Sequence, residues 1–479
     1  MTALALVIDQ GGHSSRALVF DDAGAVVAAA SAPVSSTQPA PAQVEQSPAE
    51  ILASVRTVLA RVAEQLGARA VELQSVALIV QRSSLLAWDR TSGVPLSAVL
   101  SWQDTRHAAW LEQVVAGRCE ALREITGLYP NAHYGASKMR WLLDHMPALQ
   151  HSASSGTLCM APLASWLQQQ LTGSHAPVVD AVIASRTLLT KVGATSWSQT
   201  LLDTFAIPAA VLPGVMPTLA DYGTLRFGEH SVPLRLLGGD QSFFALSHGS
   251  VFAGDTLFIN AGTGAFVQQL MSPDRMPLRL LCAPLVIGER PSASVFVAEG
   301  TVNAAATALD WWQQQAGSVF TAGEWQQAAA LADREPASVP LFCNRITATG
   351  SPDWLPAGEP AFSCPASIPL QGIAVLESVV FALQRNSDSL VAVQPANRIV
   401  LSGGLSQLAL FCQRLADLSG LPVWRSDDVE ACARGAAMQL LPAAVGQQRY
   451  HEFTPRPSAA LQQRYRQWAA MMDQLSAAG

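Results

Sequence analysis

The chain lacks the features that mark several large classes of protein. Its seven cysteines are scattered and include no Cys-x-x-Cys pair, which predicts reduced thiols and argues against both a disulfide framework and a zinc site. It has no cluster of Lys and Arg, and its net charge of −7 argues against a nucleic-acid partner. No apolar run reaches the roughly 18 residues that a membrane span needs, and no basic segment precedes the first strand as in a signal peptide. We therefore expect a cytoplasmic protein with neither a membrane nor a nucleic-acid partner.

Length and composition favour an α/β protein with more than one core. The chain has 479 residues, of which 49% are hydrophobic and 14% are charged. A chain of this length is too long for one hydrophobic core, and this composition is typical of well-buried globular domains. Two or three domains are expected.

The strongest chemical signal lies at residues 233–242. A short apolar strand is followed by Gly238 and Gly239, which we expect to turn the backbone sharply, and then by Asp240. A carboxylate held at a strand end is well placed to take a proton from a bound hydroxyl. The alternative is an ordinary surface turn in which Asp240 bonds its own backbone.

A second polar turn follows the N-terminal apolar run. Residues 3–8 form a predicted strand, and residues 9–16, Asp-Gln-Gly-Gly-His-Ser-Ser-Arg, lead into the next strand. Backbone N–H groups of this loop and Arg16 could surround an anion, while Asp9 could hold a hydrated cation. A plain polar hairpin loop is the alternative.

Arg82 and Trp102 follow two further predicted strands in the first half. An arginine and a tryptophan at neighbouring strand ends suit a small polyhydroxylated ligand, because the ring packs on carbon and the guanidinium bonds hydroxyls. The alternative for Trp102 is a place in the core.

The second half repeats this pattern, beginning at Leu234, about 230 residues after the first copy. A strand leads into Gly262-Thr263-Gly264, where Thr263 is a plausible phosphate contact. Residues 299–312 are expected to form a long helix that begins near Gly300. Gly403 and Gly404 follow a buried strand and would let the backbone approach a flat ring. The repetition predicts a duplicated fold with the ligand between the halves.

Taken together, these segments resemble the FGGY family of carbohydrate kinases, in the actin-like, ribonuclease-H-type superfamily, with motifs nearest to those of the glycerol kinases. The resemblance covers essentially the whole chain in the right order. It rests on the loop from Asp9 to Arg16 and on later segments at similar spacings: Gln81-Arg82, the hairpin that contains Gly93, Ser101–Asp104, Lys138–His145, Gly239–Gln241, Gly262–Phe266 and Ser402–Gly404.

The resemblance implies an α/β fold of two actin-like domains, residues 1–235 and 236–479, with the active site in the cleft between them. It implies an enzyme that uses ATP and Mg²⁺ to phosphorylate a small sugar or polyol, with Asp240 as general base and Asp9 and Asp240 near the metal. The implied substrate contacts are Arg82, Ser83, Trp102, His133, Tyr134, Asp240, Gln241 and Phe266. The implied nucleotide contacts are Gly11, Gly12, His13, Ser14, Arg16, Gly262, Thr263, Gly300, Gly403 and Gly404. Relatives form dimers and tetramers, and either state is implied here.

Four positions depart from the family pattern. Gly12 and His13 stand where the family usually has threonine, so a hydroxyl that faces phosphate is missing. Ser83 replaces the glutamate that binds two hydroxyls in glycerol kinases, and His133 aligns with their pocket tyrosine, with Tyr134 one place along. Losing an acceptor for a buried hydroxyl changes substrate preference. We therefore expect a tetritol, pentitol or ketose to be a better substrate than glycerol.

Two other functions compete with a kinase. The altered loop is compatible with a kinase-like protein that binds sugar or nucleotide, regulates and turns over little. An actin-like or chaperone ATPase is disfavoured, because Arg82, Trp102 and Gln241 would have no role there.

Overall fold

The computed structural model of the chain describes residues 3–248, 254–277, 279–428, 430–441 and 449–478. The chain divides into two compact units. Unit 1 comprises Met1–Ser250, Cys282–Phe296 and Glu430–Gln447. Unit 2 comprises Val251–Leu281, Val297–Val429 and Gln448–Gly479. Each unit is thus assembled from separated stretches of sequence.

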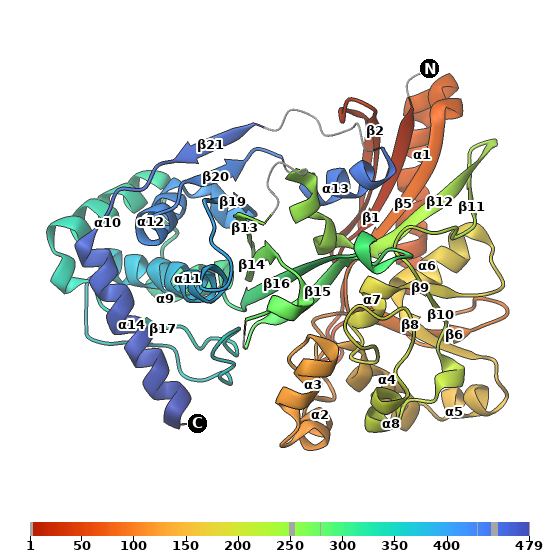
Figure 1. The fold of residues 1–479 in the computed structure, drawn as a ribbon, viewed down its shortest axis with the longest axis horizontal. Coiled ribbons are helices and arrows are strands. Elements are labelled where there is room, and N and C mark those ends of the chain that lie inside the picture. The colour runs from red at the N-terminus through yellow and green to blue at the C-terminus, as the bar shows by residue number, and fades with distance from the viewer. Residues whose placement is uncertain (1–2, 249–253, 278, 429, 442–448, 479) are drawn as a thin grey trace. The chain divides into compact units, whose positions relative to one another are not determined.

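A six-stranded sheet forms the centre of unit 1, in the order β11-β12-β5-β1-β2-β3. Figure 1 shows these strands side by side, coloured red at the N-terminus and green for β12. β1 pairs in parallel with β5, and β5 with β12, whereas β2, β3 and β11 are antiparallel to their neighbours. The strands are β1 (Leu4–Gln10), β2 (Ser14–Asp21), β3 (Val26–Pro33), β5 (Leu73–Val80), β11 (Thr224–Phe227) and β12 (His230–Gly239).

The sheet of unit 1 is buried on both faces, which explains the unbroken apolar run at the N-terminus. Because side chains alternate along a strand, Leu4, Leu6 and Ile8 pack on one face with helix α1 (Pro48–Leu66), and Val7 packs on the other with α13 (Ala431–Leu440). Helix α1 begins where the sequence predicts: the Ser47 side chain accepts a hydrogen bond from the Glu50 N–H group, and Pro48 occupies the first turn.

A second, four-stranded sheet of unit 1 has the order β4-β7-β6-β8 and is antiparallel throughout. Its strands are β4 (Glu45–Gln46), β6 (Leu85–Asp89), β7 (Val99–Leu100) and β8 (Leu158–Pro162), and β9 (Val178–Asp180) pairs separately with β10 (Gly214–Met216). The remaining helices of unit 1 are α2 (Ala108–Val115), α3 (Cys119–Thr126), α4 (Gly135–His145), α5 (Pro147–Ser154), α6 (Leu163–Thr172), α7 (Ala181–Ser185) and α8 (Gln199–Phe205).

Unit 2 repeats the sheet topology of unit 1. Its strands are ordered β16-β14-β13-β19-β20-β21: β13 is antiparallel to β14 and parallel to β19, β19 is parallel to β20, and the edge strand β21 is antiparallel. The strands are β13 (Thr256–Ala261), β14 (Ala265–Leu270), β16 (Val295–Val302), β19 (Arg398–Ser402), β20 (Val423–Ser426) and β21 (Tyr450–Phe453). The chain passes between the units within β15 (Leu281–Val286) and β16. The predicted α/β class and duplication are confirmed.

Helix α11 (Ile368–Val391) runs through the core of unit 2. By length and mean hydropathy it could cross a membrane, although Glu377 and Arg385 interrupt its apolar stretch. Of its most apolar window, 72% is buried, as expected for a core helix. The other elements of the unit are α9 (Ala306–Ala316), α10 (Ala322–Arg334), α12 (Ala409–Ser419), α14 (Ala459–Ala478), β17 (Phe342–Cys343) and β18 (Ala361–Phe362).

The structure differs from the sequence-based expectations in three respects: the start of the second copy, one helix and the domain boundary. The second copy begins at β13, since the strand that contains Leu234, β12, is the last central strand of unit 1. Residues 299–302 continue β16, and the helix begins only at Ala306, so the long helix expected from Glu299 is wrong. The boundary expected between residues 235 and 236 falls inside β12, and the compact unit continues to Ser250.

Candidate active site

Three adjacent parallel strands of unit 1 end at one edge of its sheet. Asp9 is paired with Ile79 of β5, and Ile79 is paired with Gly238 of β12. Asp240 follows directly on β12 and begins a short 3-10 helix, η3 (Asp240–Phe243). The carboxyl ends of these strands therefore bring Asp9 and Asp240 to the same edge of the sheet.

Gly238 and Gly239 do not form the sharp turn that the sequence suggests. Both continue β12, and Gly239 has an extended backbone with φ −83° and ψ 139°. Their small size is needed for close packing: a Cβ atom at position 238 would lie 2.6 Å from the Phe243 ring, and one at position 239 would lie 2.7 Å from Cγ of Arg82. The absence of a side chain at Gly239 thus lets the aliphatic part of the Arg82 side chain pack directly against the strand that precedes Asp240.

The surroundings of Asp240 tune its carboxyl group. Burial raises the pKa of Asp240 to about 6, the guanidinium of Arg82 opposes this rise, and the negative charge of Asp9 adds to it. The backbone N–H of Gln241 donates a hydrogen bond to the Asp240 carboxylate at 2.7 Å. A carboxylate with a pKa near neutrality is mostly ionised at pH 7 and can still hold a proton, as a general base requires.

Asp9 forms an ion-pair chain with residues from two other elements. The Arg16 guanidinium bonds the Asp9 carboxylate with one nitrogen and the Glu430 carboxylate with another, the latter at 2.6 Å. Burial raises the pKa of Asp9 and Arg16 opposes the rise, whereas the two carboxylates raise the pKa of Arg16 itself. Arg16 is a third exposed and can also meet an outside anion.

The loop from Gly11 to Ser14 closes with a hydrogen bond from the Gly11 N–H to the Ser14 carbonyl at 2.9 Å. His13 is exposed, and Gly11, Gly12 and Ser14 are half-buried. Gly12 has no left-handed φ, and a Cβ atom there would make ordinary contact with Nε1 of Trp102 at 3.6 Å. The backbone therefore does not require glycine at position 12.

Aromatic rings line the region beside Arg82. The ring centroids of Trp102 and His133 are 5.4 Å apart, and those of His133 and Tyr134 are 5.3 Å apart. Trp102 is 37% exposed, whereas Tyr134 is buried. Burial, with the positive charges of Lys138, Arg186 and Arg82, lowers the pKa of His133 well below its usual value. The structure thus brings together Arg82, Trp102, neutral His133 and Tyr134, four of the predicted substrate contacts.

Ser83 has a strained and unpartnered position next to Arg82. Its φ is +67°, a left-handed value that is rare for residues other than glycine. The residue is 3% exposed, and its hydroxyl has no hydrogen-bond partner among the described residues. A buried hydroxyl without a partner costs free energy, and such strain is concentrated at ligand sites.

Lys138 fixes the loops that carry these pocket residues. Its buried ammonium donates to the carbonyls of Ser83 at 3.0 Å, Ser101 at 2.7 Å and His133 at 2.9 Å. Burial lowers the pKa of Lys138 to about 7. An ammonium has three donors, so the three carbonyls use all of them. One side chain of α4 thereby holds together segments from three parts of the sequence.

Unit 2 has a glycine-containing loop at the place that corresponds to the first loop of unit 1. Gly262, Thr263 and Gly264 join β13 to β14, and Thr263 is exposed. The carbonyl of Thr263 accepts a hydrogen bond from the N–H of Ala305 at 2.9 Å, and that of Gly262 accepts one from Ala306 at 3.0 Å. The backbone at the start of α9 thus fixes the loop through its carbonyls, while the Thr263 side chain stays exposed.

The other predicted contacts of unit 2 differ in their surroundings. Gly403 has φ +91° and lies against Asn260 and Ala261, where a Cβ atom would be 2.4 Å from the Ala261 carbonyl oxygen, whereas the space beside Gly404 is open. Gly300 lies inside β16, and its missing side chain makes room for Asn386. Phe266 is a half-buried residue of β14.

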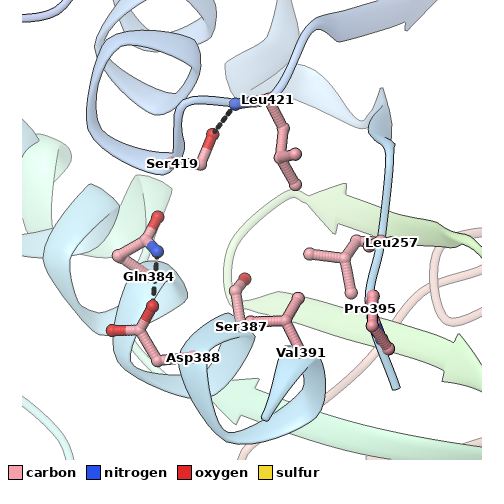
Figure 2. A pocket seen from close by; sticks show the side chains of 9 residues that line it. Leu257, Gln384, Ser387, Asp388, Val391, Pro395, Ser419 and Leu421 are labelled. Carbon is pink, nitrogen blue, oxygen red and sulfur yellow. Dashed lines mark hydrogen bonds between the residues drawn. The ribbon is translucent and has the colours of Figure 1, made fainter. Parts of the chain in front are cut away.

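Unit 2 contains a cavity of about 220 Å³, and Figure 2 shows the side chains that line it. Leu257 lines it at the start of β13, whereas the Gly262–Gly264 loop follows the end of that strand. The Gln384 side chain donates to Asp388 at 2.6 Å at its edge. This cavity therefore lies at the opposite end of β13 from the Gly262–Gly264 loop.

The described residues contain no group of three His, Cys, Asp or Glu side chains arranged to hold a metal. Asp9 and Asp240 are two carboxylates at the ends of β1 and β12, and the charge of Asp9 raises the pKa of Asp240. Mg²⁺ is commonly held by one or two carboxylates together with substrate phosphates and water. The residues present fit such a site.

Comparison with known proteins identifies the family. The models of the N-terminal and C-terminal domains of the FGGY family of carbohydrate kinases match residues 4–246 and 257–444. The chain belongs to the FGGY family of carbohydrate kinases. As an FGGY kinase it transfers a phosphoryl group from ATP to an alcohol group of a sugar or polyol.

The relatives of this FGGY kinase have different substrates. A glycerol kinase of Rhodospirillum rubrum is 31% identical over 488 residues, which cover 97% of each chain. Among solved structures, the glycerol kinase of Plasmodium falciparum with ADP has a TM-score of 0.86 and covers 99% of this chain and 98% of its own, at 18% identity. The gluconate kinase of Lactobacillus acidophilus also has a TM-score of 0.86, at 18% identity, and covers 100% and 99%. The fold is therefore that of these kinases, and it does not identify the acceptor.

Several residues at the sheet edge of this FGGY kinase are not apparent from its sequence. Glu430 contacts Arg16 across 414 positions. Burial raises the pKa of the Cys432 thiol, and the nearby charges of Asp240 and Asp9 raise it further. Neither residue belongs to a local motif. Lys138 lies within a recognised motif, but its spacing alone does not predict three carbonyl partners.

Proposed function

We propose that this FGGY kinase transfers the γ-phosphoryl group of Mg·ATP to a hydroxyl of a tetritol, pentitol or ketose in preference to glycerol. The observation that carries the proposal is the buried, unpartnered hydroxyl of Ser83 at the position of the glycerol-kinase glutamate. A hydroxyl is shorter than a carboxylate and carries no charge, so it leaves room for a larger acceptor and offers it a single weaker bond.

Asp240 is the proposed general base. It takes the proton of the acceptor hydroxyl as the acceptor oxygen forms its bond to the γ-phosphorus, while the bond to the bridging oxygen breaks and ADP leaves. The support is its place at the end of β12 and its pKa of about 6. Arg82 and Gln241 next to it are the proposed polar contacts of the acceptor, with the Trp102 ring against carbon.

The first loop and Arg16 are the proposed phosphate contacts of unit 1. Backbone N–H groups of Gly12 and His13 and the Ser14 hydroxyl would bind phosphate oxygens next to Gly11, together with the partly exposed Arg16 guanidinium. Asp9 and Asp240 are the groups that would hold Mg²⁺. When bound, this ion neutralises phosphate charge that two carboxylates alone would repel.

Unit 2 supplies the proposed remaining contacts. Gly262 and the exposed Thr263 would face phosphate, and Gly403 and Gly404 would lie along the nucleotide. The family resemblance alone supports two further assignments: Gly300 as a nucleotide contact and Phe266 as a contact of the phosphoryl acceptor. Cytoplasmic location, and assembly as a homodimer or homotetramer, are proposed on the same ground.

The test is ADP release from Mg·ATP with glycerol, erythritol, xylitol, D-xylulose and gluconate as acceptors. We expect at least one of the larger polyols or the ketose to exceed glycerol in kcat/KM by about tenfold or more. The reason is that position 83 lacks a carboxylate to accept hydrogen bonds from glycerol hydroxyls. Glycerol far ahead of all others would refute the preference and leave the kinase activity standing.

Ser83→Glu provides a direct test of the residue that carries the proposal. Restoring a carboxylate at this position should raise kcat/KM for glycerol by about tenfold, since a charged acceptor bonds hydroxyls more strongly than a neutral one. Ser83→Gln has nearly the same size without the charge and serves as the matched control. Equal glycerol rates in the two variants would show that the charge at position 83 does not select the acceptor.

A binding or regulatory protein remains the second candidate, because the first loop lacks hydroxyls at Gly12 and His13. It predicts that the protein binds ATP and a sugar without releasing ADP. ADP release that depends on the acceptor would exclude it.

A further inference from the structure

Three buried glutamines meet behind the first loop of unit 1. Gln10 is 0% exposed, and Gln46 and Gln81 are 3% exposed each. The side-chain amide of Gln81 donates hydrogen bonds to the amide oxygens of Gln10 at 3.0 Å and Gln46 at 2.9 Å. Gln81 is therefore the centre of the cluster, and the other two glutamines extend from it.

The two outer glutamines hold consecutive carbonyls of the loop. The amide of Gln10 donates to the Gly11 carbonyl at 2.7 Å, and the amide of Gln46 donates to the Gly12 carbonyl at 2.7 Å. In a trans peptide the C=O and the following N–H point in opposite directions. The N–H groups of Gly12 and His13 must therefore point away from the glutamines.

These two N–H groups form an anion-binding arrangement. Neither donates to a backbone carbonyl among the described residues, whereas the Gly11 N–H bonds Ser14 within the loop. Successive main-chain N–H groups that face one side bind phosphate oxygens. The positions concerned, 12 and 13, are those at which this chain lacks the threonine hydroxyls of its family.

The same cluster extends to the acceptor pocket. The Ser84 hydroxyl donates to the side-chain oxygen of Gln81 at 2.8 Å, and the backbone N–H of Trp102 donates to the Ser84 hydroxyl at 2.9 Å. A single amide thus connects the backbone of the loop with the backbone of the residue whose ring faces the pocket.

We propose that Gln81 is a positioning residue that, through Gln10 and Gln46, fixes the Gly12 and His13 N–H groups as phosphate donors and, through Ser84, holds Trp102 in the acceptor pocket. The inference rests on the proposed function, since it assigns phosphate to the first loop. It explains how a loop without threonine hydroxyls can bind phosphate: its main-chain donors are oriented in advance, so they lose little entropy on binding.

The test compares Gln81→Met and Gln46→Met with the wild type in binding of Mg·AMP-PNP and of adenosine. Both variants should weaken Mg·AMP-PNP about tenfold or more and leave adenosine within about twofold, because only the phosphates meet the loop. Gln169→Met is the matched control. Gln169 is equally buried, and its amide accepts from Trp88 at 2.7 Å and donates to Arg90 at 2.9 Å, with no bond to the loop or to a pocket residue.

A purely structural role predicts a different pattern. It would lower the melting temperature of all three variants and change Mg·AMP-PNP binding no more in Gln81→Met than in Gln169→Met, which would overturn the inference. If Gln81→Met does not fold, Gln46→Met decides in the same way. A wild-type protein that binds no Mg·AMP-PNP would instead overturn the proposed function on which the inference rests.

Ser84→Ala separates the two arms of the cluster. It removes the bonds of the Ser84 hydroxyl to Gln81 and Trp102 but leaves the Gln81 amide donating to Gln10 and Gln46. It should leave the dissociation constant of Mg·AMP-PNP unchanged and raise the KM of xylitol or D-xylulose, whichever the wild type phosphorylates faster, at least threefold. A Ser84→Ala variant with an unchanged acceptor KM would overturn the acceptor arm of the inference.

Discussion

Asp240→Asn will lower kcat by a factor of about 10³ or more, at the upper part of the range for loss of a general base. Asparagine is nearly isosteric and can still accept the hydrogen bond from the Gln241 N–H, but it cannot take a proton from the acceptor. Binding of Mg·AMP-PNP should stay within about threefold, since Asp9 remains to hold the metal and the phosphate contacts of both loops are unchanged. Initial-rate kinetics and equilibrium binding on one preparation measure both quantities.

Asp221→Asn is the matched control for this substitution. Asp221 is an exposed carboxylate of the same unit in a loose surface pair with Arg235 at 3.4 Å, so its loss should leave both quantities unchanged. A large loss of nucleotide binding in Asp240→Asn, with kcat little affected, would mean that the carboxylate serves the metal and not the proton.

The pH dependence gives the same experiment a second readout. Because burial raises the pKa of Asp240 to about 6, the wild-type base is ionised above that pH and protonated below it. The wild-type kcat/KM should therefore fall about tenfold per unit as the pH drops below 6. The residual activity of Asp240→Asn should lack this inflection, and its persistence would assign the titration to another group.

Gly435→Ala is expected to destabilise unit 1 by about 3 kcal/mol, at the upper end of the range for overpacking. Gly435 lies in α13. A Cβ atom added there would lie 2.0 Å from the carbonyl oxygen of Phe243 and 3.1 Å from the Cβ of Phe243. Phe243 ends η3, the short helix that begins with Asp240. To admit the methyl group, α13 must move away from η3, so the base is displaced and activity is lost as well.

Gly323→Ala provides the control for Gly435→Ala. Gly323 lies in the first turn of α10, and its nearest neighbour is 4.0 Å from the added atom, so alanine should be neutral or stabilising there. Urea unfolding gives the two differences in free energy. Equal stability of the two variants would show that α13 and η3 can separate without cost.

The sequence predicts the strands and helices that carry the site better than the tertiary contacts between its side chains. The hairpin of β1 and β2 and the capped start of α1 follow from apolar runs and from Ser47, which are local signals. Asp240 is found because it follows a buried strand. The reason given for its glycines was wrong, since Gly239 is small to admit Arg82, whose approach depends on the tertiary structure.

Other features of the site depend on partners that no local pattern contains. From the sequence, residues 299–302 are joined to the alanine-rich helical stretch that follows them, but pairing with β14 makes them a strand. The Arg16–Glu430 ion pair joins residues 414 positions apart. The bonds of Lys138 and Gln81 end on backbone carbonyls or side chains of distant segments, whose proximity only the folded sheet creates.

The division of unit 1 into separated stretches has a consequence for synthesis of the protein. β12 and η3 leave the ribosome when roughly 190 residues remain before α13, a delay of about 10 to 40 s at 5–20 residues per second. During that time Val7, Phe243 and Leu236 lack the alanine face of α13 that later covers them. The nascent chain therefore presents a persistent apolar surface, a target for a holding chaperone, and the proposed base Asp240 is fixed in place only after residues 430–441 have been made.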